Sequence, residues 1–411
     1  NHGDQAIEPQ GRRFVVFSFH STHLILFPSQ CHQNHRIGHL QSEFGATITE
    51  PVAGRKTGKN ISIRDFQKRG TDMAKKATAR KPAAKKSAPR KGKKKLLTKA
   101  DVMRKCKQLS NWGKWGPNDE LGVLNYITPE DIANAAKLVQ KGKVFRLGLN
   151  LDENGPQNGL FGGRWNPMHQ MLATGTDAVQ GIQDPIAGMR YADDAINLPT
   201  QAASQWDALS HVFTDDKMWN GYDATLVDVR GAHKNGIEKF ADKMVGRGVL
   251  LDVARYKGKE RLADGYEITT KDLEGTAKKQ GVEVRRGDFV IFNTGQMADC
   301  LDKGDWGGYG GGDAPGLGFE TVDWIHEKQI SGICSDTWGI EVRPNRSVPG
   351  LNQPWHWVTI PHIGIVHGEI WYLRELVADC AEDGVYEFFL CAPPLVITRG
   401  TGSPINPQAI K

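Results

Sequence analysis

The segment Thr200-Gln-Ala-Ala-Ser-Gln-Trp-Asp-Ala-Leu-Ser-His-Val-Phe213 determines how the rest of the chain is interpreted. In an extended segment, successive side chains point to opposite faces. The odd-numbered polar residues therefore share one face: Gln201, Gln205, Asp207 and His211. Trp206 points the other way, as a packing residue would. Groups that bind a metal or move a proton are thus gathered on one face. From the strand periodicity alone, the alternative interpretation is that this face is solvated and that its histidine is simply hydrogen-bonded.

The same segment resembles the signature H-x-G-T-H-x-D-x-P-x-H of the cyclase / kynurenine formamidase-like metal hydrolases. Asp207-Ala-Leu-Ser-His211 matches the second half of that signature, with Leu209 where proline is usual. Gln201-Ala-Ala-Ser-Gln205 occupies the first half, so glutamines stand at both metal-binding histidine positions. Around it, Trp115 to Gly122 and Lys217 to Gly221 resemble a long-form branch of the family.

The resemblance covers roughly residues 110–411 and implies the fold. We expect an α/β protein: a single mixed α/β domain of the kynurenine formamidase-like (swivelling β/β/α) type over residues 100–411, with helices around a largely β core. A disordered N-terminal extension should precede it. The family usually forms dimers or tetramers, so the resemblance also implies a homodimer or homotetramer.

Composition narrows the class of protein. The chain has 411 residues, of which 39% are hydrophobic, enough for a substantial core. No run of about 18 apolar residues occurs, so no transmembrane helix and no membrane partner are expected. The six cysteines are scattered without a C-x-x-C pair. This favours reduced thiols in a cytoplasmic protein over a disulfide framework or a zinc knuckle.

The N-terminal region differs from the rest of the chain. Residues 1–72 begin with Asn1 and lack a convincing period, and the first methionine is Met73. We interpret 1–72 as a non-native or unstructured upstream segment, which N-terminal sequencing of native protein would test. Residues 73–99 hold twelve Lys and Arg and no acid. This composition predicts a disordered basic tail, either a plain solvated one or one that makes weak nucleic-acid contact.

Most of the remaining chain alternates between expected strands and helices. The glycine-rich residues 303–318 lack both G-x-G-x-x-G and G-x-x-x-x-G-K-[ST], so a mobile loop over a pocket is expected there, and no nucleotide site. Helices are expected over 98–109, 129–139, 270–280, 322–329 and 362–382, and strands over 144–151, 225–229, 248–253, 287–295, 330–334 and 386–397.

A second group of polar residues lies near the C-terminus. If 362–382 is one helix, Glu369 stands in the middle of its apolar stripe. A buried carboxylate needs a cation or a proton, so either a metal ion or an arginine is its expected partner. His356 lies thirteen residues earlier, a spacing that resembles the family's second metal-binding pair. On this helix His367 would project away from Glu369 towards solvent. The carboxylates Asp336 and Glu341 could line the site or form ion pairs with Arg343, and structural pairing with Arg343 is expected.

If the family's chemistry carries over, the resemblance implies an arylformamidase-like hydrolase of an amide, formamide or lactone bond, as in tryptophan catabolism. A divalent metal, Mn²⁺ or Zn²⁺, would activate water, and the substrate is a small molecule. The implied metal ligands are Asp207, His356, Glu369 and Gln205. The implied catalytic residues are His211 and Glu369, with Trp206 and Gln201 at the substrate pocket.

Two other classes of function remain open from the sequence. A lyase or cyclase would use His211 and Glu369 as acid and base without a metal. A non-catalytic binding protein would have a degenerate site, because the two histidines are absent.

Overall fold

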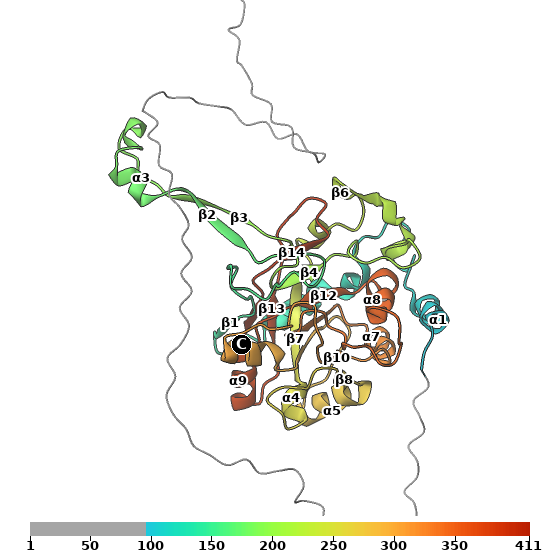
Figure 1. The fold of residues 1–411 in the computed structure, drawn as a ribbon. Helices are drawn as coiled ribbons and strands as arrows, with labels where there is room; N and C mark the ends of the chain where they lie inside the picture. Colours follow the sequence, from blue (N-terminus) through green and yellow to red (C-terminus); the bar gives the residue numbers. More distant parts are fainter. Residues whose placement is uncertain (1–95) are drawn as a thin grey trace, which may run out of the picture. The chain divides into compact units, whose positions relative to one another are not determined.

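Nine strands form one curled sheet in the computed structural model, which describes residues 96–411 (Figure 1). The strand order is β1-β15-β13-β7-β9-β11-β12-β4-β14. Strands β7, β9, β11 and β12 run parallel, and the flanking strands pair antiparallel. The bounds are β1 Val144–Arg146, β4 Gln205–Asp207, β7 Val245–Asp252, β9 Phe289–Asn293, β11 Gly332–Ser335, β12 Val366–Glu369, β13 Glu387–Cys391, β14 Gly402–Pro404 and β15 Gln408–Ile410.

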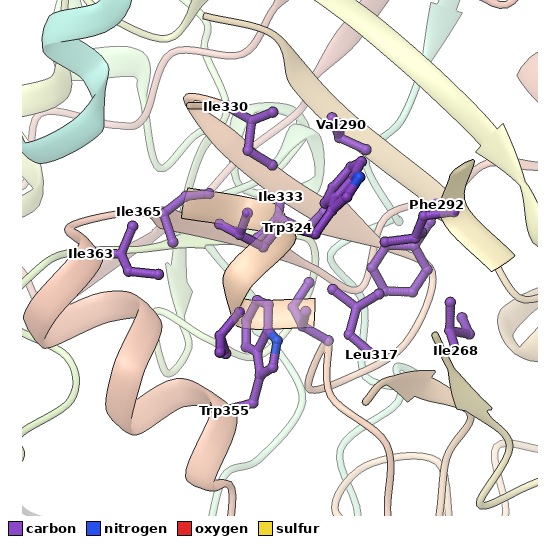
Figure 2. Packing of buried hydrophobic residues seen from close by; sticks show 14 of the residues in the cluster. Ile268, Val290, Phe292, Leu317, Trp324, Ile330, Ile333, Trp355, Ile363 and Ile365 are labelled. Atoms are coloured by element: carbon purple, nitrogen blue, oxygen red, sulfur yellow. The ribbon is translucent and has the colours of Figure 1, made fainter. Parts of the chain in front are cut away.

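The central parallel strands are buried on both faces. In β9, Val290 and Phe292 point into one apolar cluster, while Phe289 and Ile291 point into another on the opposite face. Alternation along a strand produces this division, and it explains why these strands read as continuous hydrophobic runs. Figure 2 shows the first cluster, in which Trp355 approaches the sheet from a helix.

Helices cover both faces of the sheet (Figure 1). Helices α1, α5, α7 and α8 contribute apolar residues to the first cluster, and α9 contributes to the second. Capping boxes at Thr98, Thr128 and Thr269 begin α1, α2 and α5. The bounds are α1 Lys99–Leu109, α2 Pro129–Ala136, α3 Gly175–Val179, α4 Val253–Tyr256, α5 Thr270–Gln280, α6 Gln296–Lys303, α7 Thr321–Lys328, α8 Pro354–Val358 and α9 Arg374–Asp383.

The single helix expected over 362–382 is wrong. After α8, a π-helical turn over Thr359–Ile363 ends at Gly364, whose φ of 79° lies in the left-handed region. The chain then enters strand β12, and α9 begins only at Arg374. Gly368 allows β12 to pack closely, because a Cβ there would lie 2.7 Å from Cys334 Sγ. The strand therefore needs a glycine to pack against its neighbour.

A long hairpin extends away from the sheet (Figure 1). Its strands are β2, Met168–Ala173, and β3, Asp193–Asn197, which pair antiparallel in a sheet of their own. The short helix α3 lies between them. His169 lies within β2, where its Nε2 lies 2.7 Å from Asp194 Oδ2 on β3.

Short elements complete the described chain. The strand expected over 225–229 is reduced to β5, and Val229 is fully exposed. The remaining short strands are β5 Val227–Asp228, β6 Gly231–Ala232, β8 Glu267–Ile268 and β10 Gly316–Leu317.

The mixed α/β fold expected from the sequence is confirmed for this part of the chain. Within residues 96–411, no helix combines the length and the apolar character that a bilayer crossing requires. The expectations for residues 1–72 and for most of the tail 73–99 lie outside the described residues.

Candidate active site

Strands β4 and β12 bring four polar side chains together. They pair antiparallel with Asp207 opposite His367 and Gln205 opposite Glu369. Directly opposed residues share one face of a sheet, and alternate residues on a strand do too. All four therefore lie on the same face, and each is at most 4% exposed.

His356 approaches this face from helix α8. Its Nε2 lies 3.4 Å from Glu369 Oε1, and its ring packs edge-on against that of His367, with centroids 4.7 Å apart. His356, His367 and Glu369 each bring one possible metal-ligand atom within 4.8 Å of the others. The structure thus joins residues from two elements into a candidate metal centre.

Glu341 lies behind His356. Its Oε2 accepts hydrogen bonds from the backbone N–H groups of Trp355 and His356, at 2.7 and 3.3 Å. The same oxygen lies 3.4 Å from His356 Nδ1. Burial lowers the pKa of His356, but the two flanking glutamates outweigh it and raise that pKa to about 10. In the absence of a metal, His356 is therefore a cation between two carboxylates.

The charges of the other site residues follow from burial. Burial and the nearby charge of Asp207 raise the pKa of Glu369 to about 7, although His356 opposes this. Burial holds the pKa of His367 well below its ordinary value, so that imidazole stays neutral. These groups are costly to bury without a partner.

Three buried acceptor atoms on this face have no hydrogen-bond donor: Gln205 Oε1, Asp207 Oδ1 and His367 Nδ1. A cluster of unsatisfied acceptors next to a carboxylate is unfavourable unless a cation lies among them. The donor set of imidazole nitrogen and carboxylate oxygen suits Zn²⁺ or Mn²⁺. The residues therefore fit a divalent metal.

His211 lies on the open side of the cluster. Its Nε2 is 3.8 Å from Asp207 Oδ1, and its Nδ1 is 3.4 Å from the amide nitrogen of Gln201. Burial lowers the pKa of His211, which Asp207 opposes and Arg164 reinforces. The imidazole is therefore neutral at pH 7 and able to accept a proton.

A cavity of about 350 Å³ opens over these residues. That volume suits a small organic molecule. The polar groups of its wall include Arg164, whose guanidinium lies 5.2 Å from the ring centroid of Phe161. The residues that line the cavity are Phe161, Arg164, Asp207, His211, Val212, Phe213, Trp338, Asn352, Gln353, His356, Trp357 and Glu369.

The structure places the predicted site residues in three groups. Those that line one cavity are Asp207, His211, His356 and Glu369. Gln205 and Gln201 stand behind the cavity: Gln205 donates its amide N–H to Glu369 Oε2 at 2.9 Å, and Gln201 holds His211. Trp206 is a correction to the pocket expected from the sequence. It is fully buried in the core, donates its indole N–H to the Ala392 carbonyl, and does not line the cavity.

The sequence did not identify His367 as a site residue, because on the expected helix its side chain would point to solvent. In β12 His367 and Glu369 are two residues apart and point the same way, whereas on a helix they would diverge. The pair of glycines Gly364 and Gly368 is the signal against a helix that could have revealed this. The loop before β2 contributes to the wall of the cavity, since Phe161 and Arg164 come from it. The glycine-rich stretch 303–318 does not contribute to the wall of this cavity.

Comparison with known proteins identifies relatives of this chain. The family model Cyclase ("Putative cyclase") matches residues 123–342. A solved structure described as a novel cyclase is 40% identical, with a TM-score of 0.67 over 74% of this chain and 99% of that one. Isatin hydrolase A from Ralstonia solanacearum is 19% identical, with a TM-score of 0.49 over 65% of this chain and 91% of that one. No curated protein sequence matches.

Proposed function

This chain belongs to the cyclase family, and we propose that it is a metal-dependent hydrolase of a small amide, formamide, lactam or lactone. The observation that carries the proposal is the set of buried, unsatisfied acceptors on β4 and β12 beneath an open cavity. The resemblance of the segment 200–213 to the kynurenine formamidase signature supports the same reaction class.

The metal would be held by Asp207, His356 and Glu369, which meet at the base of the cavity. A bound divalent cation lowers the pKa of a water from 15.7 to about 7 and polarises a carbonyl. Asp207 offers Oδ1, which is buried and has no hydrogen-bond donor. Glu341 Oε2 lies 3.4 Å from His356 Nδ1 on the opposite side, the place that outer-shell carboxylates take beside metal-bound histidines.

His211 is the residue placed to move protons. As a neutral imidazole on the cavity wall, it takes a proton from water at Nε2 and returns it to the leaving nitrogen or oxygen. Nδ1 must then carry a hydrogen, so in this tautomer the 3.4 Å contact with Gln201 Nε2 is not a hydrogen bond, and the amide of Gln201 donates to the Thr401 carbonyl instead.

Arg164 and the aromatic walls indicate which substrates fit. Phe161, Trp338 and Trp357 provide flat apolar surface for an aryl group. The guanidinium of Arg164 favours a substrate with a carboxylate or a carbonyl oxygen beyond the scissile bond. N-formylkynurenine, an aryl formamide with a ketone and a carboxylate beyond the scissile bond, has this form, and arylformamidase activity is the specific case that we propose to test first.

The experiment measures metal content and turnover together. Full-length protein purified without chelator should carry about one Zn²⁺ or Mn²⁺ per chain in excess of an Asp207→Ala variant. It should hydrolyse at least one member of a panel of N-formylkynurenine, aryl formamides, lactams and lactones. Asp207→Ala should lose about 1,000-fold or more in kcat/KM, a loss of about 4 kcal/mol in transition-state stabilisation.

The same measurement decides between reaction classes. His356 and Glu369 lie 3.4 Å apart and can neutralise each other without a cation, which favours a metal-free acid/base enzyme as the second candidate. Turnover that persists after complete chelation would support that candidate. Absence of both metal and turnover would instead favour a binding protein.

A further inference from the structure

One imidazole in the site has no part in the proposed function so far. His367 is fully buried at the centre of β12, directly opposite Asp207. It is too deep to touch the substrate cavity, whose wall it does not form. A buried histidine of this kind is either a satisfied core residue or a ligand, and its hydrogen bonds distinguish the two.

The hydroxyl of Thr359 fixes the tautomer of His367. Thr359 Oγ1 lies 3.0 Å from the Trp355 carbonyl oxygen and 3.0 Å from His367 Nε2. A hydroxyl has one proton to donate, and a carbonyl oxygen can only accept. Both contacts are hydrogen bonds only if Thr359 donates to Trp355 and accepts from the Nε2–H of His367. His367 Nδ1 then carries a lone pair.

That lone pair has no donor within the described part of the chain, although it is buried. Its neighbours on the same face are two further acceptors, Gln205 Oε1 and Asp207 Oδ1, also without donors. A satisfied core histidine would not present a lone pair to two unsatisfied oxygens. A cation is the partner that satisfies all three atoms at once.

The spacing of the neighbouring groups also suits one ion. His356 Nε2 and Glu369 Oε1 are 3.4 Å apart. Two ligands bound at about 2.0–2.1 Å to one tetrahedral ion are about 3.3 Å apart. His367 brings a ligand atom within 4.8 Å of both. Two histidines and a glutamate are a common donor set for catalytic zinc.

We propose that His367 Nδ1 is the second nitrogen ligand of the metal, in place of the imidazole that Gln205 does not provide. This deepens the proposed function and rests on it. Gln205 then has two contacts: its Oε1, which has no donor, faces the ion, and its amide N–H donates to Glu369 Oε2 at 2.9 Å and orients the carboxylate. The site is a centre with two histidines and two carboxylates, His356, His367, Glu369 and Asp207.

The test compares Zn²⁺ affinity in full-length protein by competition with a chromophoric chelator. His367→Gln keeps an amide N–H for Thr359, and should weaken Zn²⁺ binding by more than about 100-fold, beyond the 10–100-fold that loss of an outer-shell partner costs. Thr359→Val should weaken it by about 10-fold or less. His362→Gln is the matched control, because His362 is a buried imidazole of the same segment stacked on Trp112, and its variant should bind as the wild type does.

Residues 1–39 contain six histidines, so Zn²⁺ that binds outside the site must be subtracted from the total Zn²⁺ bound. A His356→Gln variant supplies that background. Pulsed EPR of protein loaded with one equivalent of Cu²⁺, after subtraction of the His356→Gln spectrum, should count two coordinated imidazoles in the wild type and one in His367→Gln. If His367→Gln does not fold, the number of imidazoles coordinated in the wild type still tests the role of His367.

The outcomes separate the two proposals. Wild-type protein that binds no more Zn²⁺ than His356→Gln contradicts the proposed function itself. Wild-type binding that His367→Gln retains at full affinity, or a single imidazole in the wild-type spectrum, overturns the role of His367 alone.

Discussion

Glu341 shows how a single residue behind the site governs the groups in front of it. Its carboxylate holds two backbone N–H groups at the start of α8 and stands 3.4 Å from His356 Nδ1. Glu341→Gln keeps the size of the side chain but removes its charge. We expect Zn²⁺ affinity to fall by about 10–100-fold, because the ring of His356 loses its orienting partner.

Chelator competition measures this effect, and the exposed Glu130→Gln in α2 is the control for loss of one negative charge. Equal affinities in the two variants would show that Glu341 serves only to pack α8.

Arg164 should act on substrate binding and little on the chemical step. It lies on the cavity wall, and its charge reaches His211 and Glu369. For an aryl substrate with a carboxylate, Arg164→Met should raise KM about 10- to 100-fold, matching the roughly 1.5–3 kcal/mol of a hydrogen bond to a charged group. Steady-state kinetics with a paired uncharged aryl analogue is the control. A comparable rise in KM for that analogue would assign Arg164 to packing against Phe161.

At the scale of elements, strand β12 carries two site residues and depends on Gly368 between them. An added Cβ would meet Cys334 Sγ at 2.7 Å and the rings of Trp206 and Trp371 at 2.9 Å. We expect Gly368→Ala to lower the free energy of unfolding by about 1–3 kcal/mol and to weaken metal binding, because the strand must shift.

Urea denaturation and the chelator assay measure the two effects of Gly368→Ala. Gly308→Ala is the control, since a Cβ at Gly308 meets nothing within 4 Å. A stable Gly368→Ala protein with normal metal affinity would contradict the close packing of β12.

Helix α5 gives a prediction about pH. Burial alone would raise the pKa of Asp272, but hydrogen bonds from Lys257 and from Thr269 at the capping box outweigh it and lower that pKa below 3.8. A depressed folded-state pKa contributes stability that is present above the unfolded value and lost as the pH falls through the folded one. Asp272→Asn should therefore cost on the order of 1 kcal/mol at pH 7, a size typical of capping contacts.

The free energies of unfolding of Asp272→Asn and of the wild type should become more similar as the pH falls below about 3.8, the reference pKa for aspartate. Denaturant unfolding at pH 7, 5 and 3.5 checks it. A constant difference across that range would mean that the charge of Asp272 does not stabilise α5.

The two halves of the site differ in how far the sequence predicts them. Gln205 and Asp207 alternate in a segment with a strand period, so their shared face follows from sequence alone. The stretch around Glu369 has apolar residues at helical spacing, yet it forms a strand. Pairing with β4 and β11 on both sides decides that outcome, and those partners are distant in the chain. Local periodicity cannot report such pairing, which is why His367 escaped prediction.

At the scale of the whole molecule, the sheet supplies the rigid base and the loops supply the pocket. Ligand candidates come from β4, β12 and α8, elements buried in the two apolar clusters. The cavity roof comes from the loop before β2, where sequence carries less structural information. The sequence therefore predicts the fold class, which the structure confirms, whereas the ligand set and the substrate stay predictions.

The hairpin of β2 and β3 exposes apolar side chains to an extent that a monomer does not explain. Its exposed large apolar side chains are Met168, Met171, Leu172, Val179, Ile182, Ile186, Met189, Tyr191 and Ile196. An isolated two-stranded hairpin is marginal in water, and apolar patches beyond about 300–600 Å² mark contact sites. We expect a second copy of the chain to cover it, because two identical arms related by a twofold axis bury the same surface on each partner.

Sedimentation or light scattering should give at least twice the chain mass for the wild type. The triple variant Leu172→Ser, Val179→Ser and Ile182→Ser changes three residues of the hairpin and should shift the protein to monomer. Its metal content should be retained, because these residues lie outside the cavity wall. The matched control replaces two exposed apolar residues outside the arm, Leu395→Ser and Val396→Ser, and should leave the mass unchanged. A wild type that is monomeric at micromolar concentration, or a triple variant that remains dimeric, would contradict a dimer formed through the hairpin.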